Sequence, residues 1–200
     1  MLFRSAYAAD APYDLVLKNA RIVDGTGSPW YRGDTIVRIA PQIEGNAARV
    51  IDVKGLVVSP GFIDLHTHAI RGIFKVPTAD NYTRQGVTTI MEGPDGGSPV
   101  PLKPFLDKLE ALPKSINIGS FIGQGSVREA VVGLANRKAT AEEISRMRDI
   151  VRQGMRDGAF GMSTGLFYVP GNFTPLDEVV ELVLQLFLPL AEQSHLAFQQ

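Results

Sequence analysis

The sequence predicts an α/β protein in which a small N-terminal β segment precedes a series of strand–helix units. Residues 13–59 hold several short β-branched segments with no helical periodicity. From Pro60 onward, strand-like apolar runs alternate with segments of helical spacing. Four such units in succession predict parallel strands with right-handed crossovers, either in an open α/β sheet or in part of a (β/α)₈ barrel.

Turn residues separate the strands of the N-terminal segment. "LVLKNA" and "RIVD" read as two strands that end at the turn "DGTG". "DTIVRIAP" and "ARVIDVKGLVVSP" add further strands, with a turn at Lys54 and Gly55. Residues 1–12 are expected to be a disordered tail or a signal-peptide remnant. Ala6-Tyr7-Ala8 is typical of a signal-peptidase site, although residues 1–4 are too short for the apolar part of a signal, so the expected location is cytoplasmic or periplasmic.

The first two strand–helix units follow Pro60. "GFIDLHTH" and "VTTIMEG" read as their strands. "TADNYTRQG" reads as a short helix that ends at Gly86, a residue suited to the position just beyond a helix. "VPLKPFLDKLEALP" carries leucines at helical spacing between two prolines, so it reads as the second helix.

The last two units use "INIGSFIGQG" and "AFGMSTG" as strands. Between them lies the clearest helix of the chain, which begins with a capping box of Thr140 and Glu143 and ends at Gly158. A further helix is expected in "TPLDEVVELVLQLF", with Thr174 as its N-cap and Pro175 in its first turn.

Composition restricts the possible partners. The 20 basic and 21 acidic residues give a net charge of −1, which argues against a nucleic acid or an anionic membrane as partner. The chain has no cysteine, which excludes disulfides and thiolate metal ligands. No apolar stretch approaches the ~20 residues that span a bilayer. We therefore expect a small-molecule partner, no nucleic acid and no membrane.

The stretch "SPGFIDLHTHAI" places His66 and His68, two of the three histidines, one residue apart after an apolar run. Alternate residues of a strand share one face, so both imidazoles would point the same way and could bind one divalent ion. The pair also lies at the C-terminal end of a strand, where α/β folds place their active sites. Spacing alone leaves open the alternative of two half-exposed histidines bonded to water or backbone.

The wider stretch resembles the metal-dependent amidohydrolase superfamily. "LVLKNARIVDGTG" and, later, "GLVVSPGFIDLHTH" follow the order and spacing of a family in which a β segment precedes a barrel whose first strand ends in H-x-H. "DGAFGMSTGLFYVPGNFTPLDEVVEL" resembles the N-acyl-D-amino-acid deacylases, or D-aminoacylases. The resemblance implies that residues 13–59 are part of a β-sandwich and that residues 60–182 are the first half of a TIM-like (β/α)₈ barrel, with about four βα units. Residues 183–200 depart from the family pattern and are expected to be an aberrant tail of a truncated form.

The resemblance also implies which residues bind metal. His66 and His68 match the zinc-binding histidines, and Asp95 stands where the D-aminoacylases carry a cysteine ligand. A carboxylate oxygen can bind zinc, but Asp95 and Gly96 also suit a simple turn. Glu92 is a further candidate, for which we favour a surface or ion-paired glutamate.

Substrate contacts are expected from Ser163, Thr164 and Tyr168, in and after the fourth strand. Their alternative roles are local, with the hydroxyls bonded to backbone and the tyrosine packed with its hydroxyl at the surface. Arg128 could meet a substrate carboxylate, but we favour a solvated arginine at a helix start. We assign no general acid or base.

The family chemistry is hydrolysis of the N-acyl amide bond of an N-acyl-D-amino acid by a zinc-dependent enzyme, in which the metal lowers the pKa of its water towards ~7. The implied partner is therefore a small N-acyl amino acid. Two alternatives stay open. One is a catalytically inactive fragment that self-associates through open sheet edges. The other is a dihydroorotase- or hydantoinase-like enzyme, against which the fourth-strand motif argues.

Overall fold

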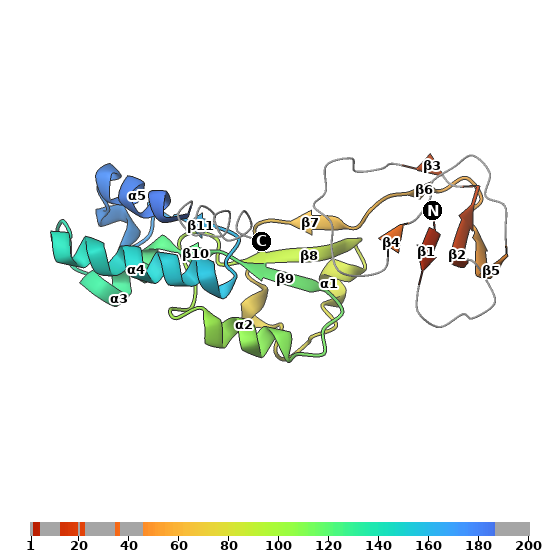
Figure 1. Ribbon diagram of the computed structural model, residues 1–200, viewed down its shortest axis with the longest axis horizontal. Helices are drawn as coiled ribbons and strands as arrows, with labels where there is room; N and C mark the ends of the chain where they lie inside the picture. The colour runs from red at the N-terminus through yellow and green to blue at the C-terminus, as the bar shows by residue number, and fades with distance from the viewer. Residues whose placement is uncertain (1, 5–12, 20, 23–34, 37–45, 187–200) are drawn as a thin grey trace, which may run out of the picture. The chain divides into compact units, whose positions relative to one another are not determined.

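The computed structural model describes residues 2–4, 13–19, 21–22, 35–36 and 46–186. The chain divides into two compact units, residues 1–60 and 61–200 (Figure 1). The predicted signal remnant Ala6-Tyr7-Ala8 and most of the predicted aberrant tail lie outside the described residues. Among the described helices, none has both the length and the apolar character needed to cross a membrane.

The N-terminal unit is built from strands, as its β-branched segments predict. Its larger sheet has the order β4-β1-β2-β5, in which β1 is antiparallel to both neighbours and β2 is parallel to β5. The turn predicted at Lys54 and Gly55 is confirmed, because both have positive φ, +51° and +81°. A second sheet pairs β3 with β6 in parallel. The strands are β1 (Leu2–Arg4), β2 (Tyr13–Lys18), β3 (Arg21–Ile22), β4 (Thr35–Ile36), β5 (Ala47–Asp52) and β6 (Val57–Val58).

The second unit contains the parallel strands that the alternating pattern predicts. Three of them form a sheet in chain order, β7-β8-β9, and β10 pairs in parallel with β11. Only Phe121 separates β9 from β10, so this third strand contacts β8 with its first part and β11 with its second. The strands are β7 (Phe62–Asp64), β8 (Val87–Glu92), β9 (Asn117–Ser120), β10 (Ile122–Gly123) and β11 (Met162–Ser163).

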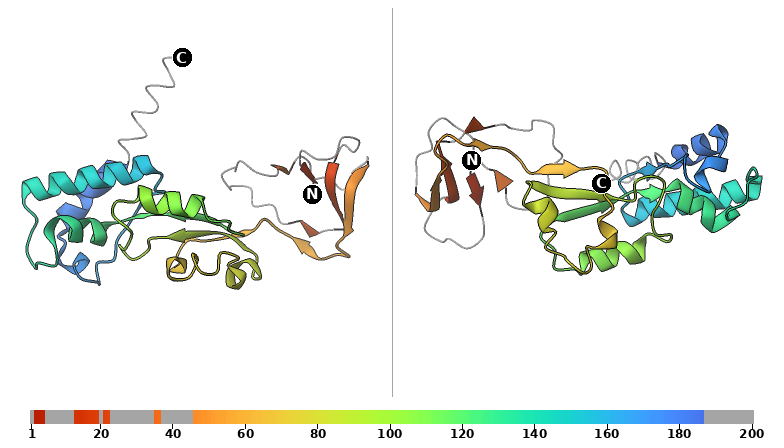
Figure 2. Two further views of the ribbon diagram at one scale, coloured as in Figure 1. Left: turned by 90° about the horizontal axis from the view of Figure 1, so that it is seen from below. Right: turned by 180° about the vertical axis from the view of Figure 1, so that it is seen from behind.

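Helices connect these strands and cover them. The α3 and α4 helices contact β10, α5 packs against α4, and α1 contacts β8 (Figures 1 and 2). The helices are α1 (Asp80–Thr83), α2 (Lys103–Glu110), α3 (Gln124–Val132), α4 (Ala141–Asp157) and α5 (Leu176–Val183), with 3-10 turns η1 (Ala69–Arg71), η2 (Gly171–Phe173) and η3 (Leu184–Leu186).

Helix caps agree with the sequence at α4 and differ at α5. Thr140 and Glu143 form the predicted capping box, and Gly158 ends α4 in the left-handed region at φ +112°. The N-cap predicted at Thr174 is wrong, because α5 begins one residue later with Pro175 as N-cap. The Thr174 hydroxyl instead accepts a hydrogen bond from the Gln124 side-chain amide at 2.9 Å, so it is not available to the helix.

The core of the second unit lies between the strands and the amphipathic faces of α2, α3 and α4. Gly154 of α4 packs directly on Ile122, since an added Cβ would lie 3.2 Å from that side chain. Each large apolar side chain buried here contributes about 1.5–3 kcal/mol to folding. This packing leaves the carboxyl ends of β7 and β8, and the loops that follow them, free to form a site. Fully buried members include Ile90, Leu102, Ile122, Val127, Met147, Val151 and Leu182.

Candidate metal centre

The two histidines lie beyond the end of β7 and not within it. The predicted strand through His68 is therefore wrong, because β7 ends at Asp64. The Asp64 carboxylate accepts a hydrogen bond from the backbone N–H of His66 at 3.1 Å, which turns the chain out of the sheet. Between the histidines, Thr67 is buried, and its N–H donates to the carbonyl oxygen of Met91 at 3.2 Å.

This geometry still gives the two imidazoles a common side. Because Thr67 points into the protein, its neighbours His66 and His68 point out of it. Their ring centroids lie 5.6 Å apart. The predicted convergence is thus retained, although an irregular segment and not a strand produces it.

Asp95 completes the group from the loop that follows β8. Its Oδ2 lies 3.2 Å from Nε2 of His66 and 3.4 Å from Nε2 of His68. One ligand atom from each residue can be chosen so that all three lie within 4.8 Å of one another. The structure therefore brings together the three residues that were predicted to hold a metal.

The alternative interpretation, that Asp95 and Gly96 form a turn, is also confirmed. Gly97 donates its N–H to the Pro94 carbonyl oxygen at 3.1 Å, which closes a β-turn. Asp95 and Gly96 at its centre have φ of +56° and +76°, as in a type I′ turn. Aspartate tolerates this region better than most residues. The turn is therefore the means by which the carboxylate reaches the histidines.

The donor set suits zinc. Tetrahedral ligands at 2.0–2.2 Å from zinc stand about 3.3 Å from one another. Both imidazole–carboxylate distances match this spacing. The side chains of His66, His68 and Asp95 are 62%, 50% and 35% exposed, so a fourth position would be open to water or substrate.

The end of β11 fixes the loop that carries Asp95. Ser163 Oγ donates to the carbonyl oxygen of Gly93 at 2.5 Å and accepts from the N–H of Gly96 at 3.0 Å. Gly165 approaches even more closely, because an added Cβ would lie 1.9 Å from the Asp95 carbonyl oxygen. The Ser163 hydroxyl thus faces the loop on both sides of Asp95.

The other two predicted substrate residues stand at the surface beside this contact. Thr164 and Tyr168 are exposed and flank Gly165 in the loop after β11. Tyr168 packs edge-to-face against Phe167, with ring centroids 5.5 Å apart. Because Gly165 touches the Asp95 loop, Thr164 and Tyr168 lie on the segment next to the candidate ligands and are free to contact a ligand.

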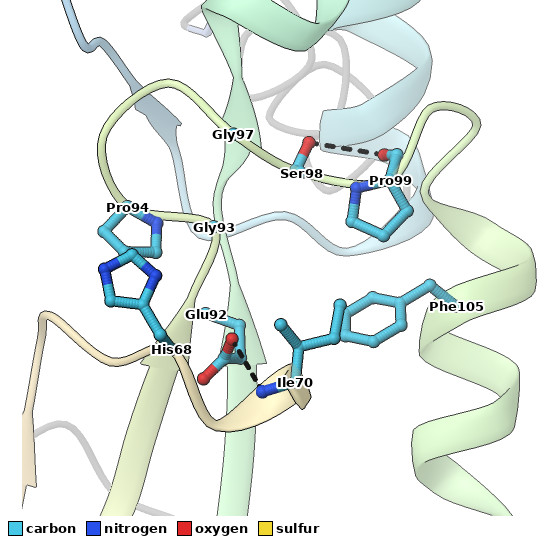
Figure 3. Close-up of a pocket in the computed structure, with 9 residues that line it drawn as sticks. All are labelled: His68, Ile70, Glu92, Gly93, Pro94, Gly97, Ser98, Pro99 and Phe105. Carbon is cyan, nitrogen blue, oxygen red and sulfur yellow. Dashed lines mark hydrogen bonds between the residues drawn. The ribbon is translucent and has the colours of Figure 1, made fainter. Parts of the chain in front are cut away.

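Glu92 does not lie at the surface. The expectation of a surface or ion-paired glutamate at this position is therefore wrong. Its side chain is buried, with 2% exposed, and bonds to Thr67 and to the backbone of η1. It lines a pocket of about 260 Å³ together with His68, Ile70 and Phe105 (Figure 3). Burial first, and then the charges of Glu92 and Asp64, raise the pKa of Tyr82. Sequence reasoning missed Thr67, whose position between the two histidines is its only signal.

Arg128 is also buried, so the predicted solvated position at a helix start is wrong. Its guanidinium donates to Glu178 at 2.5 Å and to the carbonyl oxygen of Arg137 at 2.5 Å. The side chain of Arg128 is 0% exposed and that of Glu178 is 1% exposed. The pair joins α3 to α5. The Arg128 guanidinium is therefore bonded to a carboxylate inside the protein.

Comparison with known proteins supports the resemblance read from the motifs. No family model matches the chain. A D-aminoacylase of Alcaligenes xylosoxydans xylosoxydans is 34% identical over 86% of this chain, and an N-acyl-D-aspartate deacylase of the same organism is 32% identical over 87%. The chain is a relative of the D-aminoacylases.

Solved structures agree with this kinship. A crystal structure of D-aminoacylase, described as defining a subset of amidohydrolases, is 33% identical over 88% of this chain with a TM-score of 0.77. An N-acyl-D-glutamate deacylase of Bordetella bronchiseptica, solved with zinc and a phosphonate inhibitor, is 29% identical over 84% with a TM-score of 0.74. The chain spans 41% of the length of each of the two Alcaligenes relatives and 43% and 42% of these two structures.

Proposed function

We propose that this D-aminoacylase relative carries the metal-binding part of an amidohydrolase that hydrolyses the N-acyl amide bond of N-acyl-D-amino acids. The observation that carries the proposal is the convergence of His66, His68 and Asp95 where parallel strands end. Parallel α/β folds place their active sites at these strand ends. The relatives named for N-acyl-D-amino-acid hydrolysis support the substrate class.

We further propose that the second unit is the first half of a (β/α)₈ barrel. Its strands follow one another in parallel and in chain order, from β7 to β9 and from β10 to β11. The third strand, β9 and β10 together, links the two sheets because only Phe121 interrupts it. A barrel built in this way gathers the loops after β7, β8 and β11 on one face. The strands of the N-terminal unit would form part of a β-sandwich.

In this proposal Nε2 of His66, Nε2 of His68 and Oδ2 of Asp95 hold a zinc ion. When bound, zinc acts as a Lewis acid that polarises the acyl carbonyl and lowers the pKa of water. Asp95 supplies an oxygen where the D-aminoacylases supply sulfur, so the site is harder and favours oxygen-preferring ions more than a thiolate site does. The carboxylate also brings a negative charge that the two neutral imidazoles lack.

Substrate recognition is proposed for the loop after β11. Thr164 and Tyr168 would contact the N-acyl amino acid from their exposed positions beside the metal ligands. Ser163 would contribute at the same edge while its hydroxyl holds the Asp95 loop. Since Gly165 packs on Asp95, these residues share one surface with the metal ligands.

The test compares the two enantiomers of the substrate. The chain, freed of metal and then supplied with Zn²⁺, is assayed for amine release from N-acetyl-D- and N-acetyl-L-amino acids. Zinc-dependent release from the D form alone supports the proposal. Release from the L form, or no release by a folded chain shown to bind zinc, contradicts the proposed activity while leaving the metal site in place.

A second property is proposed for β7. Among the described strands it pairs with β8 alone, so it is the outer strand of the β7-β8-β9 sheet, and its side chains Phe62 and Ile63 are exposed. Unpaired outer strands with apolar side chains pair with other chains. We therefore propose self-association through β7. Sedimentation velocity of Phe62→Ser should show a shift towards monomer, whereas an unchanged distribution contradicts this role of β7.

A further inference from the structure

Glu92 is a buried carboxylate beside the proposed metal ligands that neither the ligand set nor the substrate loop uses. We propose that it is a positioning residue for His68, and that its hydrogen bonds to the turn around His68 set the affinity of the site for a divalent cation. The inference rests on the proposed metal site and concerns what holds that site in shape.

The hydrogen-bond donors around the Glu92 carboxylate come from both sides of His68. Glu92 Oε1 accepts from the hydroxyl of Thr67 at 2.5 Å and from the N–H of Ala69 at 2.7 Å. These two residues are the immediate neighbours of His68 in the chain. Oε2 accepts from the N–H of Ile70 at 3.1 Å (Figure 3). Both residues that flank His68 are thus bonded to a single oxygen atom, so the imidazole is directed away from Glu92.

The proton of the Thr67 hydroxyl goes to the carboxylate. Thr67 Oγ1 lies 2.9 Å from the Met91 carbonyl oxygen as well as 2.5 Å from Glu92 Oε1, and a hydroxyl donates only one proton. The Met91 oxygen already accepts the backbone N–H of Thr67 at 3.2 Å. Hydrogen bonds to a charged acceptor are the stronger ones. Thr67 is therefore tied to β8 by its backbone and to Glu92 by its side chain.

In the described part of the chain, no Lys, Arg or His side chain forms an ion pair with Glu92, which is only 2% exposed. A buried carboxylate needs hydrogen-bond donors to both oxygens, and the η1 turn supplies them. Glu92 and His68 line the same pocket. The carboxylate therefore acts on the segment around His68 through its hydrogen bonds.

Three hydrogen bonds from the segment around His68 hold the Glu92 carboxylate, and its place in the described group of possible metal ligands is taken by other residues. The group that could hold an ion consists of His66, His68 and Asp95 and does not include Glu92. Residues that orient a metal ligand typically change metal affinity 10–100-fold when they are replaced. The expected effect of Glu92 is therefore on affinity and not on the identity of the ligands.

Glu92→Gln is the sharpest variant, because the side chain keeps its size. The amide presents one oxygen and one NH₂ group, and the NH₂ would face either an N–H donor of the η1 turn or the hydroxyl of Thr67. Glu178→Gln is the matched control, since it changes another buried glutamate of the same unit that bonds to Arg128 and lies outside the metal site. Co²⁺ titrations followed by visible absorption report both the affinity and the ligand geometry.

We expect Glu92→Gln to bind Co²⁺ about 10-fold more weakly or worse, with an altered absorption spectrum. Glu92→Asp, which keeps the charge, should fall between this variant and the parent. Glu178→Gln should stay within about twofold of the parent, although it unfolds at a lower temperature. A folded Glu92→Gln protein with the parent's affinity and spectrum overturns the inference.

Thr67→Val decides the matter if Glu92→Gln does not fold, because it removes only the hydroxyl bonded to Glu92. A weaker Co²⁺ affinity of this variant supports the positioning role, and an unchanged affinity overturns it. A parent chain that is folded and binds no Co²⁺ overturns the proposed metal site itself. The two failures are therefore distinguishable, because only the second affects the parent chain.

Discussion

The candidate site is made of two neighbouring strand ends that are built in opposite ways. At the end of β7 the side chains face solvent, and Leu65 and His66 are 64% and 62% exposed. At the end of β8 they are buried, with Met91 4% and Glu92 2% exposed. The difference teaches that the exposed candidate ligands owe their geometry to a buried neighbour, because Thr67 bonds to Met91 through its backbone and to Glu92 through its side chain.

The largest effect is expected where the exposed end supplies the ligands. The double change His66→Ala and His68→Ala should weaken Zn²⁺ binding by more than about 100-fold, beyond the loss expected from any residue that only orients a ligand. Isothermal titration with Zn²⁺ measures it. Asn136→Ala, at an exposed position away from the site, should bind Zn²⁺ like the parent. Retained Zn²⁺ binding in the double variant would show that these two histidines do not form a metal centre.

The buried end should dominate stability. Met91→Ala should lower the free energy of unfolding by about 2–5 kcal/mol, because it leaves a cavity in the closed part of the sheet. Leu65→Ala, at the exposed end, should change it by about 0.5 kcal/mol or less. Urea denaturation of the two variants measures the contrast. Equal losses would show that the two ends are not built differently.

Steric contact between the two loops gives the next effect. Gly165→Ala places a Cβ 1.9 Å from the Asp95 carbonyl oxygen, so the loop must shift, at a cost of about 1–3 kcal/mol. Zn²⁺ affinity should fall with it. Gly72→Ala is the matched control, because an added Cβ there meets nothing within 4 Å and its φ is −131°. If both variants behave alike, the loop contact does not constrain Asp95.

Ser163→Ala should have a smaller effect on the same loop. It removes the hydroxyl that bonds to Gly93 and Gly96, which contributes about 1 kcal/mol and leaves the backbone donor of Gly96 unpaired. We expect a few-fold loss of Zn²⁺ affinity and a slightly lower melting temperature. Ser145→Ala, on the exposed side of α4, serves as control. A loss confined to substrate turnover would instead assign Ser163 to the substrate alone.

The smallest effect lies far from both strand ends and depends on pH. Hydrogen bonds from Arg137 and from the Thr140 N–H lower the pKa of Glu143 from 4.5 to about 2. A lowered pKa stabilises the folded state above pH 4.5, and this contribution is lost as pH falls from 4.5 towards 2. The melting temperatures of the parent and of Glu143→Gln should therefore differ at about pH 6. They should converge as the pH falls to about 2. Constant separation would exclude this linkage.

Sequence reasoning was sufficient where the controlling contacts are local. The alternation of strands and helices, the α4 capping box and the turn at Lys54 follow from residues within a few positions of one another. The candidate metal ligands followed from the H-x-H spacing and from the family pattern that placed Asp95 in the next loop. The type I′ turn at Asp95 and Gly96 was visible as a dipeptide, although its use in orienting a ligand was not.

Long-range contacts account for what the sequence did not reveal. β7 stops at Asp64, and the histidines point outward, because Thr67 bonds to a strand 24 residues later. Glu92 is buried because its donors come from residues 22 to 25 positions earlier. Arg128 is buried because Glu178 stands 50 residues away in the chain. A single sequence does not show such pairs, since each residue type alone is typical of a surface.

The close approach of Gly165 to Asp95 couples the loop after β11 to the loop after β8. With no side chain between the two backbones, neither loop can shift without displacing the other. We therefore expect a molecule that displaces Thr164 or Tyr168 to shift the Asp95 carboxylate as well. Binding at one position would then alter the geometry of the other through a contact between backbones.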